Sequence, residues 1–323
     1  MNVPALLGAA CLALSLTRAP QAAPTDVAAA HAAANALPQL HALVVSRRGE
    51  IVFEHYAKGH AAGRLANVKS ASKSLIAALV GIAIERKLIA GVQDPIVRWF
   101  PELRTAADPR RRAITIEDLL TMRSGLASTS GPGYGRWVTS PNWVRHVLQQ
   151  PMVSDPGTSM EYSSGTSHLL SAILTKATGT TTHRFAVEAL ARPLGIALAR
   201  WPRDPQGIYF GGNEMLLTPR QMIAVGELWR NDGRVKGAQV VPADWVRTSC
   251  EPRTRSRWAC SSSIRPALSR SARTRSTKAR TSSTGIPVRL SRTTTSSRPR
   301  ATSSNTRCPP AVRGRSPSSP LRS

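Results

Sequence analysis

The chain has few cysteines, and none of them falls in its central region. The four lie at the two ends of the sequence: Cys11, Cys250, Cys260 and Cys308. Residues 24–249 can therefore contain neither a disulfide nor a cysteine metal site. This does not argue against export, because exported proteins need not contain disulfides.

Long hydrophobic runs are also scarce. The longest, Ala5–Leu16, is too short to span a bilayer and has the length of a signal-peptide core. Small residues follow it, as cleavage requires. We therefore predict that residues 1–23 are a signal peptide, that the protein is periplasmic or secreted, and that no transmembrane segment remains after cleavage. The alternative is a disordered, alanine-rich leader.

Acidic residues are almost absent from the C-terminal part. Residues 251–323 contain 17 of the 44 basic residues but one of the 18 acidic ones, and 28 of these 73 residues are Ser or Thr. No aromatic residue follows Trp258. Such a composition cannot bury enough apolar surface to fold alone. The sequence thus predicts a folded domain over residues 24–257 and a disordered Ser/Thr/Arg-rich tail over residues 258–323.

The domain begins with a helix and a hairpin and continues mainly as helices. Residues 26–37 are alanine-rich and favour a helix, and apolar residues on both sides of residues 47–50 indicate a β-hairpin over residues 41–56. Apolar positions at helical spacing predict a long helix over residues 70–89, with Gly91 just beyond its end. A hairpin alone is marginal, so these strands need further strands or a packed layer.

The remaining helices carry recognisable start and stop signals. Thr115, with Asp118 three residues later, is a plausible N-cap, and Thr218 with Pro219 is another. Gly179 ends the helix predicted to begin at Gly165. Further helices are predicted over residues 94–101, 140–149, 183–194 and 242–248, and residues 104–112 are polar and basic, as in a surface loop.

Ser70 and Lys73 form a Ser-x-x-Lys motif at the start of an apolar helix. Three residues of spacing place both side chains on one helix face. A serine hydroxyl becomes a good nucleophile when a base takes its proton, and a desolvated lysine can serve as that base or orient another. The helix N-terminus favours a developing oxyanion. The plainer interpretation is an N-cap serine with a solvated lysine.

Tyr162 lies 92 residues after Ser70, just before a predicted helix. A tyrosine in such a loop can reach a cleft and relay protons when nearby cations lower its pKa. On local sequence alone, it is better explained as an ordinary half-buried aromatic residue. His168, Trp229 and Met122 are better explained by packing, because the first two lie on helices with apolar neighbours and methionine fills gaps in cores.

Three segments occur in an order that resembles one family. They are Val68-Lys69-Ser70-Ala71-Ser72-Lys73-Ser74, Ile116-Glu117-Asp118-Leu119-Leu120-Thr121-Met122-Arg123-Ser124-Gly125-Leu126 and Tyr162-Ser163-Ser164-Gly165-Thr166-Ser167-His168-Leu169-Leu170. Together they resemble the β-lactamase-related serine hydrolases, which include class C β-lactamases, DD-peptidases, carboxylesterases and 6-aminohexanoate-dimer hydrolases. The segment around Tyr162 and that over residues 216–220 are most similar to the aminohexanoate-hydrolase branch.

The resemblance implies an α/β, β-lactamase/transpeptidase-like fold, in which helices flank a sheet and a helical subdomain follows the Ser70 helix. It also implies an amide or ester hydrolase that works through an acyl-enzyme on Ser70. Lys73 and Tyr162 would move the proton, and the Ser70 N–H would supply half of the oxyanion hole. Ser164 takes the place of the family's usual asparagine as a substrate-binding residue. This mechanism needs no metal or cofactor, and its partner is a small-molecule amide or ester.

One family motif is missing. A Lys-Thr-Gly or His-x-Gly strand normally lines the cleft and gives the second oxyanion N–H, but the nearest string is Ser283-Thr284-Gly285. Without the C-terminal strands, the chain as written is expected to be weakly active or inactive. Losing one oxyanion donor typically costs about 100- to 1000-fold in rate.

The tail is consistent with out-of-frame translation of a GC-rich gene. Reading one base earlier turns TCN serine codons into codons for Leu, Ile, Val or Phe, and ACN threonine codons into codons for Asp, Asn, His or Tyr. Residues 293–304 then read as strand, turn and strand, like the closing hairpin expected in the family. Sequencing the locus tests this frameshift hypothesis, which requires the family motif in a neighbouring frame.

Two other functions remain open. The chain could be a catalytically dead protein that still captures acyl ligands or peptidoglycan. Alternatively, its basic tail could bind an anionic surface or nucleic acid, although such a tail is odd on an exported hydrolase and we do not expect nucleic acid as a partner. The sequence does not indicate an oligomeric state.

Overall fold

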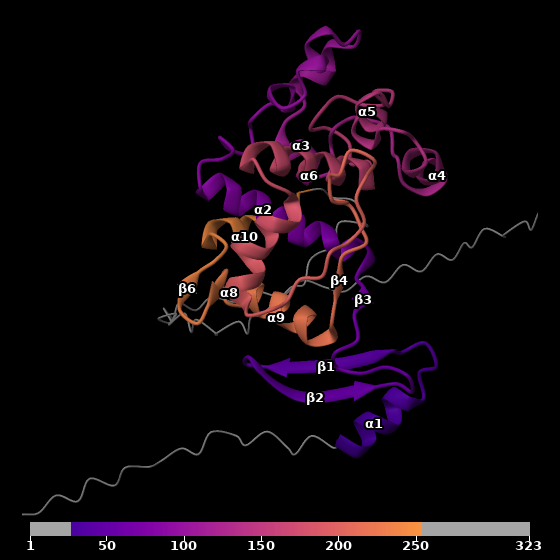
Figure 1. The fold of residues 1–323 in the computed structure, drawn as a ribbon, viewed down its shortest axis with the longest axis vertical. Coiled ribbons are helices and arrows are strands. Elements are labelled where there is room, and N and C mark those ends of the chain that lie inside the picture. The colour runs from indigo at the N-terminus through magenta and orange to yellow at the C-terminus, as the bar shows by residue number, and fades with distance from the viewer. Residues whose placement is uncertain (1–26, 254–323) are drawn as a thin grey trace, which may run out of the picture. The chain divides into compact units, whose positions relative to one another are not determined.

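The computed structural model describes residues 27–253. The predicted signal peptide (residues 1–23), the tail (residues 258–323) and the expected loss of C-terminal strands all lie outside the described residues. Within them, helices predominate, and the strands form three separate two-stranded sheets. Figure 1 shows the order of these elements.

The predicted hairpin is confirmed. β1 (Ala42–Arg47) pairs antiparallel with β2 (Glu50–Tyr56), and both residues of the turn between them have positive φ, Arg48 at 56° and Gly49 at 89°. Such turns match the natural twist of a hairpin. Helix α1 (Val27–Asn35) packs against β2, and α9 (Pro219–Arg230) packs against β1. The hairpin is thus held between two helices.

Two helices form the centre of the core. The 3₁₀ turn η1 (Lys69–Ala71) leads into α2 (Ser72–Glu85), which packs against α6 (Ser164–Thr178). The end predicted for the helix over residues 70–89 was four residues too late, because Lys87 adopts a left-handed conformation with φ 58°. The predicted end of α6 is confirmed, since Gly179 has φ 65°.

Shorter helices surround this pair. α3 (Ile116–Leu120) and α5 (Trp143–Leu148) both pack on α6, and α4 (Tyr134–Val138), which the sequence did not predict, packs on α5. α3 begins with the predicted capping box, in which Thr115 and Asp118 exchange hydrogen bonds. Thr218 likewise caps α9, together with Gln221.

Two predicted segments differ in detail. The helix expected over residues 183–194 is α7 (Thr182–Ala186), a π-helical turn η6 (Val187–Ala191) and α8 (Arg192–Leu194). The segments expected as a short helix and a loop are instead three 3₁₀ turns: η2 (Ile96–Arg98), η3 (Pro101–Thr105) and η4 (Pro109–Ala113). Pro101 and Pro109 occupy the first positions of η3 and η4, where the missing N–H of proline is not needed.

A strand pair distant in sequence ties the domain together. β3 (Ala66–Asn67) pairs with β4 (Leu216–Leu217), which places the start of η1 beside the segment that leads into α9. β5 (Arg234–Val235) and β6 (Ala238–Gln239) form a tight hairpin, and α10 (Ala243–Ser249) follows. α10 approaches α2 closely, since a Cβ added at Gly81 would lie 2.6 Å from the Trp245 indole.

In the part of the chain that the structure describes, no helix combines the length and the apolar character that crossing a membrane requires.

Candidate functional site

Ser70 lies in the 3₁₀ turn that precedes α2, and its environment is set by its neighbours. Lys69 has φ 50°, which is uncommon for a residue with a side chain and is typical of strained positions near functional groups. The fully buried Ser72 donates to the Lys69 carbonyl (2.7 Å) and accepts from the Met215 N–H (3.2 Å). The Val68 N–H donates to the Met215 carbonyl (3.0 Å). The strained turn is therefore fixed to the chain near β4.

The Lys73 ammonium lies at the meeting point of three segments. Its Nζ is 3.4 Å from Ser70 Oγ and 3.2 Å from Ser164 Oγ, and it also donates to the Gly212 carbonyl. Burial lowers the pKa of Lys73, although the nearby Tyr162 opposes this shift. A lysine held this way is more readily deprotonated than one in water.

Tyr162 completes the cluster from the loop before α6. Its hydroxyl is 3.0 Å from Ser70 Oγ, and Lys73 Nζ lies 5.0 Å from the centre of its ring. Burial acts to raise the pKa of Tyr162, but the Ser70 hydroxyl and the Lys73 charge together bring the pKa below its usual value. Ser70 Oγ thus contacts two groups whose pKa values are both lowered, so each group loses its proton more readily than it would in water.

A polar loop holds the segment that carries Tyr162 and Ser164. Three consecutive residues contact three others that are 34 positions later in the chain. Ser128 Oγ donates to the Tyr162 carbonyl (2.6 Å), and Thr129 and Ser163 hydroxyls are 3.1 Å apart. Ser130 Oγ accepts from the Ser164 N–H (2.9 Å) and lies 3.3 Å from Ser164 Oγ. These bonds hold the backbone from Tyr162 to Ser164, the stretch that carries two of the predicted site residues.

Residues 208–215, which we call the glycine loop, close the site from the other side. A Cβ added at Gly212 would lie 2.5 Å from the Ser164 carbonyl oxygen, and one at Gly211 would lie 2.3 Å from that of Ser167. Only glycine allows the loop to approach the first turn of α6 so closely. This approach brings the Gly212 carbonyl to Lys73.

The structure therefore brings together all four site residues that the sequence predicted: Ser70, Lys73, Tyr162 and Ser164. Sequence reasoning missed Ser130 and Gly212. The pair Gly211-Gly212 was a visible signal for a close backbone approach, whereas nothing in the local sequence marked Ser130.

The three residues assigned to packing differ from one another. His168 is fully buried, and Trp229 packs against the core as predicted. Met122 is half-buried and lies outside the core cluster, and its carbonyl accepts a bond from the Glu161 N–H (2.8 Å).

Between residues 27 and 253, no group of three or more His, Cys, Asp or Glu side chains could hold a metal ion.

Comparison with known proteins agrees with this geometry. The family model described as Beta-lactamase matches residues 32–248. The chain belongs to the beta-lactamase family. The β-lactamase/transpeptidase-like fold predicted from the sequence is thereby confirmed, and members of this beta-lactamase family are typically serine hydrolases.

The individual proteins to which the chain is similar share limited sequence with it. An uncharacterized protein of Mycobacterium tuberculosis is 39% identical over 109 aligned residues, and this match covers 27% of each protein, so the chain spans about a quarter of the length of this relative. A solved structure of EstCE1, a hydrolase with promiscuous acyltransferase activity, has a TM-score of 0.58 at 19% identity and covers 70% of this chain and 76% of its own.

A Bacillus anthracis protein assigned as a 6-aminohexanoate-dimer hydrolase has a TM-score of 0.55 at 18% identity, with 64% of this chain and 58% of that chain covered. At such identities, the structural matches establish the beta-lactamase fold and leave the substrate open.

Proposed function

We propose that this protein is a serine hydrolase that cleaves an amide or ester bond through an acyl-enzyme on Ser70. The observation that carries the proposal is the position of Ser70 Oγ, which is 3.0 Å from the Tyr162 hydroxyl and 3.4 Å from Lys73 Nζ. A nucleophile within hydrogen-bond reach of its base, which is itself held by further groups, is the arrangement that covalent catalysis requires.

The proposed reaction uses these groups in turn. Ser70 Oγ attacks the substrate carbonyl carbon while Tyr162, supported by the Lys73 charge, takes the hydroxyl proton. The tetrahedral intermediate collapses, the proton passes to the leaving amine or alcohol, and the acyl group stays on Ser70. Water, deprotonated by the same pair, then releases the acid and restores the serine.

Ser164 and the Gly212 carbonyl have positioning roles in this proposal. Both lie close to Lys73 Nζ, and Ser164 Oγ is 3.2 Å away. Ser164 therefore contacts Lys73 although it is shorter than the asparagine usual in the family. The Ser70 N–H serves as one oxyanion donor. The resemblance places the second donor in a C-terminal strand whose motif is missing from this sequence, and we therefore expect slow turnover.

The proposal is tested by labelling the purified full-length chain with a fluorophosphonate or penicillin probe and measuring its intact mass. We expect a single adduct that is absent from Ser70→Ala, because the nucleophile has been removed. An adduct that persists in Ser70→Ala would contradict the proposal. A folded chain that binds acyl ligands without forming an adduct would favour the alternative of a catalytically dead binding protein.

The rate of labelling should depend on pH. Below the pKa of the Tyr162–Lys73 pair both groups are protonated and no base is available, so labelling is slow; above it, labelling is fast. Because the pKa values of both groups are lowered, we expect the rate to reach half its maximum below the usual phenol pKa of about 10. Tyr162→Phe should remove this rise. Measurement of the rate from about pH 6 to pH 10 decides, and a flat profile would contradict the proposed base.

A further inference from the structure

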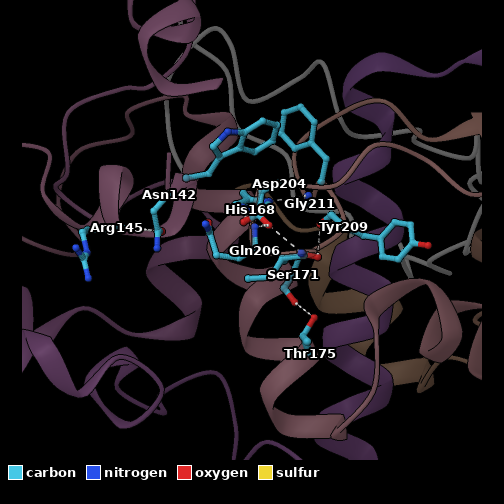
Figure 2. A network of polar contacts seen from close by, with 12 residues as sticks. Asn142, Arg145, His168, Ser171, Thr175, Asp204, Gln206, Tyr209 and Gly211 are labelled. Atoms are coloured by element: carbon cyan, nitrogen blue, oxygen red, sulfur yellow. Dashed lines mark hydrogen bonds and ion pairs between the residues drawn. The ribbon is translucent and has the colours of Figure 1, made fainter. Parts of the chain in front are cut away.

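A buried histidine–aspartate pair lies behind the candidate site and contacts none of its reacting atoms. His168 Nε2 is 3.0 Å from Asp204 Oδ2, and both side chains are completely inaccessible to solvent. His168 lies on α6, one turn after Ser164, and Asp204 lies in the loop before the glycine loop. Figure 2 shows the two side chains facing each other, with Gly211 and Tyr209 beside them.

The hydrogen bonds determine which nitrogen of His168 carries the proton. The Gly211 N–H donates to His168 Nδ1 (3.3 Å), so this nitrogen must be unprotonated. The proton therefore sits on Nε2, which donates to Asp204. The imidazole thus accepts at Nδ1 from the Gly211 amide and donates at Nε2 to the Asp204 carboxylate.

Asp204 is itself fixed by the backbone. Its Oδ1 accepts from the N–H groups of Gln206 (2.9 Å) and Ile208 (2.8 Å). Together with the bond from His168, the Asp204 carboxylate accepts hydrogen bonds from three N–H groups. Asp204 thus joins the turn at residues 204–208 to α6.

An aromatic cage keeps the histidine in place. The rings of Trp137, Trp143 and Phe210 each meet the His168 ring edge-on, with centroids 5.4 to 5.9 Å apart. Such contacts stabilise one ring orientation. The imidazole cannot easily turn to exchange its two nitrogens.

We propose that the His168–Asp204 pair positions the glycine loop so that the Gly212 carbonyl holds the Lys73 ammonium beside Ser70. Gly211, which His168 binds, precedes Gly212, which accepts from Lys73. A shift of the Gly211 amide moves the next carbonyl, and with it the orientation of Lys73. His168 and Asp204 are positioning residues, and the catalytic part of this inference rests on the proposed function of Ser70 and Lys73.

The substitution Asp204→Asn tests the pair with little change of shape. The amide oxygen keeps the bonds from Gln206 and Ile208, so its NH₂ group faces His168 Nε2. His168 must then accept at Nε2 and carry its proton on Nδ1, where it meets the Gly211 N–H donor to donor. We expect labelling of Ser70 to slow by roughly 10- to 100-fold, as for a misplaced catalytic group.

Thr175→Val is the matched control. Thr175 lies two turns further along α6 and bonds to the Ser171 carbonyl and the Thr182 hydroxyl. Its link to the glycine loop is indirect and runs through Ser171, whose hydroxyl donates to the Tyr209 carbonyl. Loss of the Thr175 hydroxyl removes comparable partly buried polar contacts, so it reports what destabilisation alone does to labelling. His168→Phe, which retains an aromatic ring without hydrogen bonds, should behave like Asp204→Asn. Equal slowing in Thr175→Val at a similar melting temperature would overturn the proposal.

Hydrogen–deuterium exchange gives a readout that does not need activity. We expect peptides covering residues 208–215 to exchange faster in Asp204→Asn and to be unchanged in Thr175→Val. If the parent chain does not label at all, the proposed function fails, and the exchange rates alone then decide whether the pair holds the loop. Unchanged exchange in Asp204→Asn, or labelling at the parental rate, would overturn the proposal.

Discussion

Lys73→Met is expected to reduce the rate of Ser70 labelling by about 100- to 10,000-fold, the usual contribution of a proton-transferring group. Lys73 Nζ contacts Ser70 and Ser164 and supplies the positive charge that lowers the pKa of Tyr162. Methionine fills much of the same volume but has no charge and no proton to exchange. The variant therefore loses both a proton carrier and the group that favours the Tyr162 phenolate. Stopped-flow or gel-based labelling rates at several pH values measure the effect.

Lys69→Met is the control for this variant. Lys69 directly precedes Ser70, but its side chain is 70% exposed and lies 3.5 Å from Glu214. An exposed ion pair contributes at most about 1 kcal/mol, or about fivefold in rate. A loss of equal size in both variants would mean that general positive charge near Ser70 matters, and it would contradict a specific role for Lys73.

Gly212→Ala is expected to slow labelling by roughly 100-fold, because a displacement of about 1 Å at a catalytic group can cost this much. The added Cβ would lie 2.5 Å from the Ser164 carbonyl oxygen and 2.9 Å from its Cβ. Either the first turn of α6 or the glycine loop must move, and both carry a contact to Lys73. We also expect a loss of about 1–3 kcal/mol in the free energy of unfolding, as is typical of overpacking. Labelling rates and urea unfolding measure the two effects.

Gly226→Ala offers a matched comparison. Gly226 lies within α9, and a Cβ at this position would meet no atom within 4 Å. Alanine in a helix interior is about 0.5–1 kcal/mol more favourable than glycine. We therefore expect a small gain in stability and an unchanged labelling rate. If Gly212→Ala labels as fast as Gly226→Ala, the close approach of the glycine loop is not needed for the site.

Local signals in the sequence predicted the local features of the fold. Thr115 and Thr218 cap helices as expected, and Gly179 ends α6 in the left-handed conformation. Each cap joins residues three positions apart, and Gly179 acts through its own conformation, so all three signals are visible in a single stretch of sequence. The end of α2 was misjudged because Lys87, a residue with no preference for positive φ, ends the helix before Gly91.

The site was predictable only in part, for the same reason. The Ser70–Lys73 spacing is local, whereas Tyr162 and Ser164 entered through the resemblance to a family. The contacts of Lys73 with Gly212 and of Ser130 with Ser164 join residues 139 and 34 positions apart. No periodicity or cap signal records such contacts. His168 was assigned to packing from its apolar neighbours, and that prediction did not foresee its bond to Asp204.

The pairing of β3 with β4 has a consequence for biosynthesis. Ala66 lies opposite Leu217, 151 positions later, so the strand that leads to the Ser70 turn gains its partner only after those residues have been made. Contacts of such long sequence separation form late and slowly. On the ribosome, the hairpin and α2 emerge well before the segment that fixes Ser70 and Lys73. During that interval, the site around Ser70 is incomplete, and we expect the order of synthesis to delay its reactivity until the glycine loop has emerged.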